Sequence, residues 1–305
     1  MKPTKLSLKK GIRHLSWTEI GVLIKDTFVE FFKEKSFFHG AALSYYTIFA
    51  LVPMLYLSFA TFGKIVGHDT MIEIVGKILK EQVGIKDISG IISFLNEINL
   101  EKGSFILNLF GIIALVLSST ALLMSLRGSL NDFFDIEISF QNKNKKKMIL
   151  DTILTRLVSV SMLAIFGVII IVLYFAQTIL ISFGNEFFKD PNAVSWVFME
   201  FSQHGISILT NLLIFTLIFR YLHDGVVMWK LALGGALVTT ILLYFGQLLI
   251  KSYLAHYFFA KNGGIAGTLM IILLWTYYSS QIIFFGAKFT AVYAKTAGKP
   301  IVAKR

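Results

Sequence analysis

The sequence predicts an all-α integral membrane protein with six transmembrane helices, and three observations lead to that fold class. Six long apolar stretches are separated by charged or glycine-rich segments. Hydrophobic residues make up 55% of the chain and charged residues only 15%, whereas soluble domains carry about 25% charged residues. Lysine and arginine are concentrated in alternate connecting segments. Backbone amides in lipid must bond within their own segment, so each apolar stretch is expected to be a helix.

Residues 1–39 are predicted to form a cytoplasmic N-terminal segment. The stretch Trp17–Phe38 carries too many charges to span a membrane. Its apolar residues nevertheless recur at helical spacing, at Trp17, Ile20, Ile24, Phe28 and Phe31. We expect an amphipathic helix lying in the cytoplasmic interface. No short apolar segment with a cleavage site precedes the first span, so a signal peptide is not expected.

The six-helix membrane domain is predicted over residues 40–287. Its first span, Gly40–Phe62, contains no Asp, Glu, Lys or Arg and would extend about 34 Å as a helix, enough to cross a hydrocarbon core of about 30 Å. Pro53 predicts a kink within it. The fourth apolar run is short, but residues 195–204 extend it upstream. The other predicted spans are 105–126, 157–183, 200–219, 231–250 and 265–287.

Residues 64–104, between the first two spans, contain two further apolar stripes that predict amphipathic helices at the outer face. Such helices either cover a cavity or simply pack on the bundle. The stripes are Met71, Ile74, Val75, Ile78 and Leu79, and then Ile88, Ile91, Ile92 and Leu95.

The charge distribution predicts the orientation. With both termini on one side, the segments on that side hold 21 of the 29 lysines and arginines. The positive-inside rule therefore places both termini, including a basic tail at 288–305, in the cytoplasm. The lysines at 143 and 145–147 are expected to attract anionic lipid headgroups. Nucleic acid is not an expected partner, because no aromatic residues alternate with these lysines.

Four amides are predicted near the outer leaflet: Asn108, Gln177, Asn211 and Gln247. They predict either a polar vestibule that holds a headgroup or solute, or hydrogen bonds between helices. No Asp or Glu lies within a span, which argues against a proton relay. Arg220, Lys251 and Lys288 lie at span ends, where long side chains are expected to extend to the headgroups. Glycines 234–235 and 263–264 are expected to allow close helix packing.

The sequence contains no recognisable catalytic, cofactor or metal site. The chain has no cysteine, and its six histidines lack metal-binding spacing. Asn131, Asp132, Asp135 and Glu137 follow the second span and suggest a cation site, but a solvated acidic loop is the preferred interpretation. His223 and Asp224, beside Arg220, form a candidate polar knot in a turn where charges are ordinary. We expect neither an enzyme nor a bound cofactor.

Several motifs occur in the order found in the YihY/BrkB family of bacterial inner-membrane proteins. The segment 41–53, with Tyr45, Tyr46 and Pro53, resembles that family's first span. Residues 126–131, ending at Asn131, resemble the end of its second span. Gly235 within 229–236, and Trp275 and Gly286 within 274–287, are similar to its fifth and last spans. The resemblance covers about residues 20 to 295.

The resemblance implies six helices, cytoplasmic termini, no cofactor and a location in the bacterial cytoplasmic membrane. Family members were formerly labelled ribonuclease BN, but the residues here lack the clustered carboxylates or histidines of a metal-dependent nuclease. The family usually has Glu after the final Gly-Ala, where this chain has Lys288. If that carboxylate pairs with a cation in relatives, the pairing is lost or reversed here.

Two functional hypotheses follow. The first is a non-enzymatic, transporter-like protein that moves or receives a lipid or another amphiphile at the outer side of the membrane. The outer amides, Pro53 and the amphipathic outer loop favour it. The second is a structural or accessory subunit that acts as a platform for envelope proteins. The absence of acidic residues from the spans favours that one. A ribonuclease is the least favoured alternative.

Overall fold

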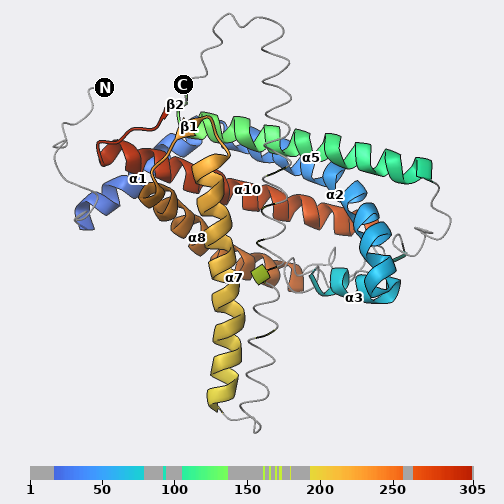
Figure 1. The fold of residues 1–305 in the computed structure, drawn as a ribbon. Coiled ribbons are helices and arrows are strands. Elements are labelled where there is room, and N and C mark those ends of the chain that lie inside the picture. Colours follow the sequence, from blue (N-terminus) through green and yellow to red (C-terminus); the bar gives the residue numbers. More distant parts are fainter. Residues whose placement is uncertain are drawn as a thin grey trace, which may run out of the picture. The chain divides into compact units, whose positions relative to one another are not determined.

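The computed structural model describes residues 17–78, 92–93, 105–136, 161, 165, 169, 172–173, 179, 193–256 and 264–303. Its long elements are helices, as the all-α prediction requires (Figure 1). The helices are α1 (Trp17–Lys33), α2 (Ser36–Val66), α3 (His68–Ile78), α5 (Phe105–Phe133), α7 (Ala193–Tyr221), α8 (Trp229–His256) and α10 (Gly264–Thr296). Two short strands, β1 (Gly225–Val226) and β2 (Val302–Ala303), complete the described elements.

Four stretches of these helices are long and apolar enough to cross a membrane. They are Leu109–Phe133, His204–Tyr221, Trp229–Ile250 and Leu269–Thr296. The helix α2 covers the predicted first span and remains helical through Pro53. The helix α7 begins at Ala193, so the upstream extension of the fourth span is part of the same helix. The predicted third span, 157–183, lies almost entirely outside the described residues, and the number of six spans remains a prediction.

The N-terminal helix differs from its prediction in length and in the face that it buries. It ends at Lys33 and not at Phe38, because Lys35 adopts a left-handed conformation (φ 50°) and a new helix begins at Ser36. Leu23 and Thr27 are buried, whereas Ile24 and Phe28 are about half exposed. Both faces carry apolar side chains, so helical spacing alone did not identify the packed face.

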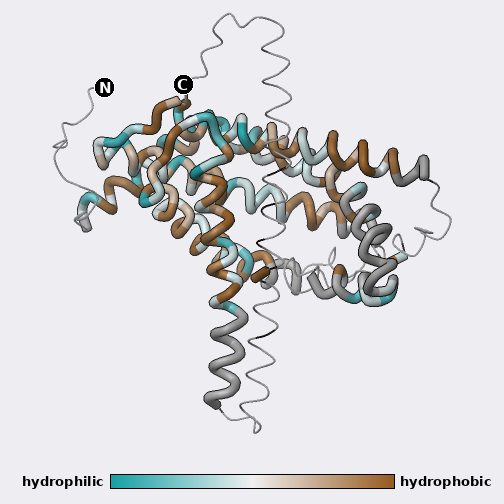
Figure 2. Tube along the Cα trace, viewed as in Figure 1, coloured by the Kyte–Doolittle hydropathy of each residue, from teal (hydrophilic) through white to brown (hydrophobic). Residues whose placement is uncertain are grey.

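The chain forms two compact units. The first contains residues 1–30, 130–241 and 285–305, and the second contains 31–129 and 242–284. In the first unit, β1 and β2 pair antiparallel, with Gly225 opposite Ala303 and Val226 opposite Val302 (Figure 1). Residues 288–305, predicted as a basic tail, therefore include the end of α10 and a strand. Hydrophilic residues gather where α1, the end of α10 and the two strands lie (Figure 2).

The helices α8 and α10 cross closely in the first unit through two matched Gly–Thr pairs. A Cβ atom added to Gly235 of α8 would collide with Thr290 Oγ1, and one added to Gly286 of α10 would collide with Thr239 Oγ1. Each threonine hydroxyl donates a hydrogen bond of 2.8 Å to the glycine carbonyl on its own helix. The predicted close packing at Gly235 is confirmed, since a larger residue has no room there.

The second unit has similar close contacts of its own. A Cβ atom added to Gly40 of α2 would collide with Gln281 of α10, and one added to Gly246 of α8 would collide with Tyr278. Gln281 Nε2 donates a hydrogen bond of 3.1 Å to the carbonyl of Ser36, which fixes the beginning of α2 against α10.

Candidate functional site

The first unit contains four ionised side chains that we call the charged cluster: Glu30 of α1, Asp135 after α5, and Lys288 and Lys295 of α10. Lys288 Nζ lies 2.8 Å from Asp135 Oδ1 and 3.7 Å from Glu30 Oε2. Lys295 Nζ lies 2.8 Å from Asp135 Oδ2 and 3.4 Å from the same Glu30 oxygen. Two cations thus face two carboxylates, and the cluster is neutral as a whole.

Lys288 is the buried centre of this cluster. Its side chain is 1% exposed, whereas Glu30, Asp135 and Lys295 are 32%, 35% and 47% exposed. Lys288 and Lys295 are close to two helical turns apart, so both project from one face of α10. The prediction that Lys288 extends to the lipid headgroups is wrong. Its ammonium group is instead held by carboxylates from two other segments, because burial of an unpaired charge is costly.

The backbone at the end of α5 positions Asp135. The N–H of Ile136 donates to Asn131 O at 2.9 Å, and the N–H of Asp135 donates to Asp132 O at 3.1 Å. These two bonds form a Schellman motif, in which the residue at position 135 takes a left-handed conformation (φ 55°). Glycine is usual at such a position. Aspartate tolerates it and adds a carboxylate directed at α10.

The surroundings of Asp135 act on its pKa in opposite directions. Burial raises the pKa of Asp135, because it disfavours the charged carboxylate. The hydrogen bonds and positive charges of Lys288 and Lys295 lower it and prevail, so the pKa lies below the ordinary value of 3.8. The carboxylate is therefore ionised at neutral pH and, together with Glu30, balances the charges of the two lysines of α10.

A second contact joins the end of α5 to the turn between α7 and α8. Asn131 Nδ2 donates to Asp224 Oδ2 at 2.8 Å, and the N–H of Asp224 donates to Asn131 Oδ1 at 2.9 Å. Asn131 is buried, and its amide is thus satisfied on both sides by one residue. Asn131 was identified from a sequence motif, and this reciprocal pair gives it a structural role.

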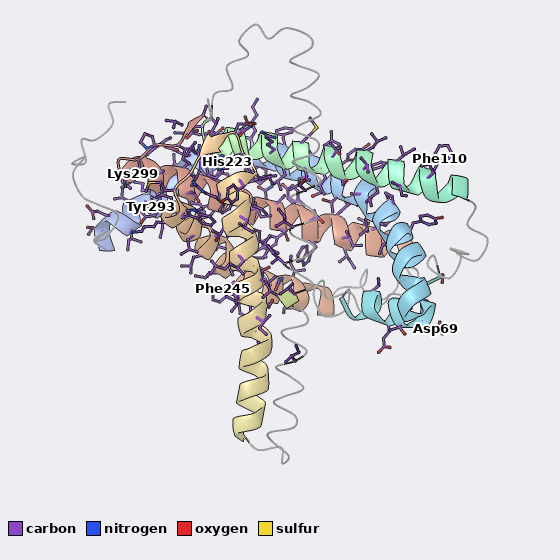
Figure 3. The ribbon with its side chains drawn as sticks, in the orientation of Figure 1. Asp69, Phe110, His223, Phe245, Tyr293 and Lys299 are labelled. Carbon is purple, nitrogen blue, oxygen red and sulfur yellow. The ribbon has the colours of Figure 1, made fainter. Side chains whose placement is uncertain are left out.

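His223 is fully buried in the same turn, against the ring of Phe134 (Figure 3). The N–H of Gly225 donates to His223 Nδ1 at 2.9 Å, and His223 Nε2 lies 2.8 Å from the carbonyl of Phe219. An amide N–H only donates and a carbonyl only accepts, so the ring is neutral, with its proton on Nε2. Asp224 and His223 therefore do form a structured polar turn.

Within the part of the chain that the structure describes, Arg220 takes no part in the hydrogen bonds of that turn. Its guanidinium carbon lies 5.6 Å from the centre of the Trp229 ring and 5.8 Å from that of Tyr221. The predicted polar knot is thus divided, with His223 and Asp224 facing α5 and Arg220 facing aromatic rings.

Comparison with known proteins identifies the family. The family described as virulence factor BrkB matches residues 27–305. The chain belongs to the virulence factor BrkB family. A UPF0761 membrane protein of Stenotrophomonas maltophilia (strain K279a) is 24% identical over 272 residues, which cover 89% of this chain and 60% of the relative. The chain thus spans less than two thirds of that relative's length. No solved structure matches the chain.

The residues of the family motifs lie in environments that differ from one motif to the next in this BrkB protein. Asn131, Gly235 and Gly286 all belong to the first unit, where Asn131 binds the turn and the two glycines form the α8–α10 crossing. Tyr45 is exposed and its ring lies 4.6 Å from that of Phe49. Tyr46, Pro53 and Trp275 are partly buried. We assign no structural role to Tyr45, Pro53 or Trp275.

The structure describes only two of the four side chains of the vestibule predicted for the BrkB protein. Asn211 of α7 and Gln247 of α8 are partly buried, and they belong to different units. Gln177 and the side chain of Asn108 lie outside the described residues. The vestibule therefore remains a prediction.

The acidic residues after α5 are the one candidate cation site that the sequence suggests. Among the described residues, no group of three or more His, Asp or Glu side chains is arranged to hold a metal ion. Asp135 faces two lysines, which compete with a cation for the same oxygens. The charged cluster is not predicted by the sequence pattern, although the lysine at 288 in place of the usual Glu indicates an altered pairing there.

Proposed function

We propose that this BrkB-family protein is a non-enzymatic, transporter-like membrane protein that moves or receives a lipid or another amphiphile, and that the charged cluster closes its inner end. The observation that carries the proposal is the composition of the cluster. Segments from α1, α5 and α10 are joined there by ion pairs around a buried lysine, within an otherwise strongly apolar chain.

Ion pairs are better suited to an end of the protein that opens and closes than to an end that stays closed. Replacing a buried ion pair with apolar side chains is often neutral or stabilising, so these charges are a weak way to hold helices together permanently. When water enters, the separated ammonium and carboxylate groups regain hydration, and the contact opens at a small net cost. Apolar side chains that are exposed in the same way gain no favourable hydration.

The outer amides supply the other half of the proposal. Asn211 and Gln247 are both partly buried. A lipid headgroup carries hydrogen-bond acceptors that such amides can bind. In the proposal, a headgroup is bound at the outer side, where the sequence predicts these amides to lie, while the charged cluster stays closed.

The test is lipid movement in vesicles that contain the purified protein. A fluorescent phospholipid is placed in both leaflets, and dithionite added outside bleaches the lipid that reaches the outer leaflet. Faster bleaching than in protein-free vesicles is expected for the wild type, and slower bleaching for the double variant Asn211→Leu, Gln247→Leu. Gln281→Leu is the same change on α10, at a residue that the predicted topology places toward the cytoplasmic side, and it is the matched control once its folding is verified. A wild-type rate equal to that of empty vesicles would favour the platform for envelope proteins instead.

A further inference from the structure

Arg220, at the end of α7, has a guanidinium group that is not fully satisfied by the described residues. Its Nε atom is buried and has no hydrogen-bond partner among them. The Asp224 carboxylate, close by in sequence, accepts a hydrogen bond of 2.8 Å from Asn131. Arg220 is only partly buried, and its guanidinium group carries four N–H donors besides that of Nε, so a ligand with acceptor oxygens can bind there.

Two aromatic rings enclose this guanidinium group. Tyr221 and Trp229 lie edge to face, with ring centres 5.9 Å apart, and both are about half exposed. The Arg220 guanidinium lies within 5.8 Å of both ring centres. Tryptophan and tyrosine are enriched at the level of lipid headgroups, where one part of the ring is in lipid and another in water. The arrangement is therefore typical of a membrane–water interface.

An apolar stripe continues from Trp229 along α8. Leu233, Leu237 and Ile241 follow at intervals of four residues, and all are about half exposed. Residues at this spacing lie on one face of a helix. Lys230, beside Trp229 in the first turn of α8, is also exposed. A positively charged aromatic site thus lies at one end of an apolar track.

We propose that Arg220, Tyr221 and Trp229 bind the phosphate of an anionic phospholipid, whose acyl chains lie along the α8 stripe from Trp229 to Ile241. A guanidinium group binds two phosphate oxygens at once and can still stack on aromatic rings. Lys230 favours a headgroup with net negative charge. The charge distribution of the sequence assigns this site to the cytoplasmic leaflet, so it is separate from the vestibule and does not depend on the proposed function.

The test uses the full chain, purified in mild detergent and freed of lipid. Dioleoyl phosphatidylglycerol or dioleoyl phosphatidylcholine is then added, and native mass spectrometry measures how many lipid molecules each protein binds. We expect the wild type to bind phosphatidylglycerol and Arg220→Met to bind about tenfold less of it, the factor expected for a lost hydrogen bond to a charged group. Arg220→Lys keeps the charge but not the paired donors, and should be intermediate. Lys25→Gln, which removes an exposed cation from α1, is the control and should bind as the wild type does.

A second measurement keeps Arg220 and so does not depend on the folding of its variants. With Trp17, Trp196 and Trp275 replaced by Phe, fluorescence reports on Trp229 alone. Brominated phosphatidylglycerol should quench it at lower mole fractions than brominated phosphatidylcholine. Equal quenching by the two lipids would overturn the proposal, as would unchanged phosphatidylglycerol binding by Arg220→Met. Displacement of the lipid by millimolar inorganic phosphate would show a site for free phosphate and also overturn it.

Discussion

Lys288 and Asp135 differ in their access to water, which predicts unequal effects of removing each charge. Asp135→Asn leaves the buried Lys288 with Glu30, whose carboxylate oxygen is 3.7 Å away, and should lower the free energy of unfolding by about 3 kcal/mol. Lys288→Met leaves Asp135 paired with Lys295 and open to water, and should cost about 1 kcal/mol. Tryptophan fluorescence during denaturation in detergent measures both. A larger cost for Lys288→Met would contradict this account of the cluster.

The lowered pKa of Asp135 predicts how acid acts on the same residue. A carboxyl group whose pKa is lower in the folded state stabilises the protein above its ordinary pKa of 3.8, and this contribution disappears as the pH falls through the lower, folded-state value. The melting temperatures of the wild type and Asp135→Asn should therefore differ by a constant amount from pH 7 to about pH 5 and converge below pH 3.8. A difference that stays constant below that pH would show that the Asp135 charge does not contribute.

At the scale of helices, the α8–α10 crossing depends on glycine at two positions. Gly235→Ala would place a methyl group against Thr290 Oγ1, and such overpacking typically costs about 1–3 kcal/mol. Thr290→Ala should recover part of this loss in the double variant, because it removes the opposing atoms. Gly205→Ala in α7 is the matched control, since no atom of the described residues lies within 4 Å of its added Cβ atom, and it should be neutral or stabilising. Unfolding in detergent checks all three, and an equal loss at Gly205 would contradict the crossing.

The sequence predicted which segments are helices, but it did not predict which side chains of those helices contact one another. The predicted spans at 40–62, 105–126, 231–250 and 265–287 lie within α2, α5, α8 and α10, because lipid forces long apolar runs to be helical. The charged cluster could not be predicted in this way. Asp135 and Lys288 are 153 residues apart, and a lysine at the end of an apolar run has the same local pattern whether it reaches headgroups or a buried carboxylate.

For the whole molecule, the structure brings together helix ends that the charge distribution assigns to one side. The end of α5, the α7–α8 turn and the end of α10 all lie in the first unit. The natural absence of cysteine makes the assignment to the cytoplasm testable with single introduced cysteines. An impermeant maleimide applied to intact spheroplasts should label Asp69→Cys, in the predicted outer segment, and should reach Lys299→Cys only after permeabilisation. Labelling in the opposite order would reverse the predicted orientation.

The most direct test of the closing role of the charged cluster is to tie it shut. Asp135 and Lys295 lie on different segments, their charged atoms are 2.8 Å apart, and both are partly exposed to a reagent. In the double variant Asp135→Cys, Lys295→Cys, a short bifunctional thiol reagent that is cleaved by reduction would join the end of α5 to α10, while Lys288 and Glu30 remain. Lipid movement in vesicles should stop when the two cysteines are joined and return on reduction, whereas each single-cysteine variant should be unaffected by the reagent. If the joined protein moves lipid as fast as the reduced one, the charged cluster does not close the inner end.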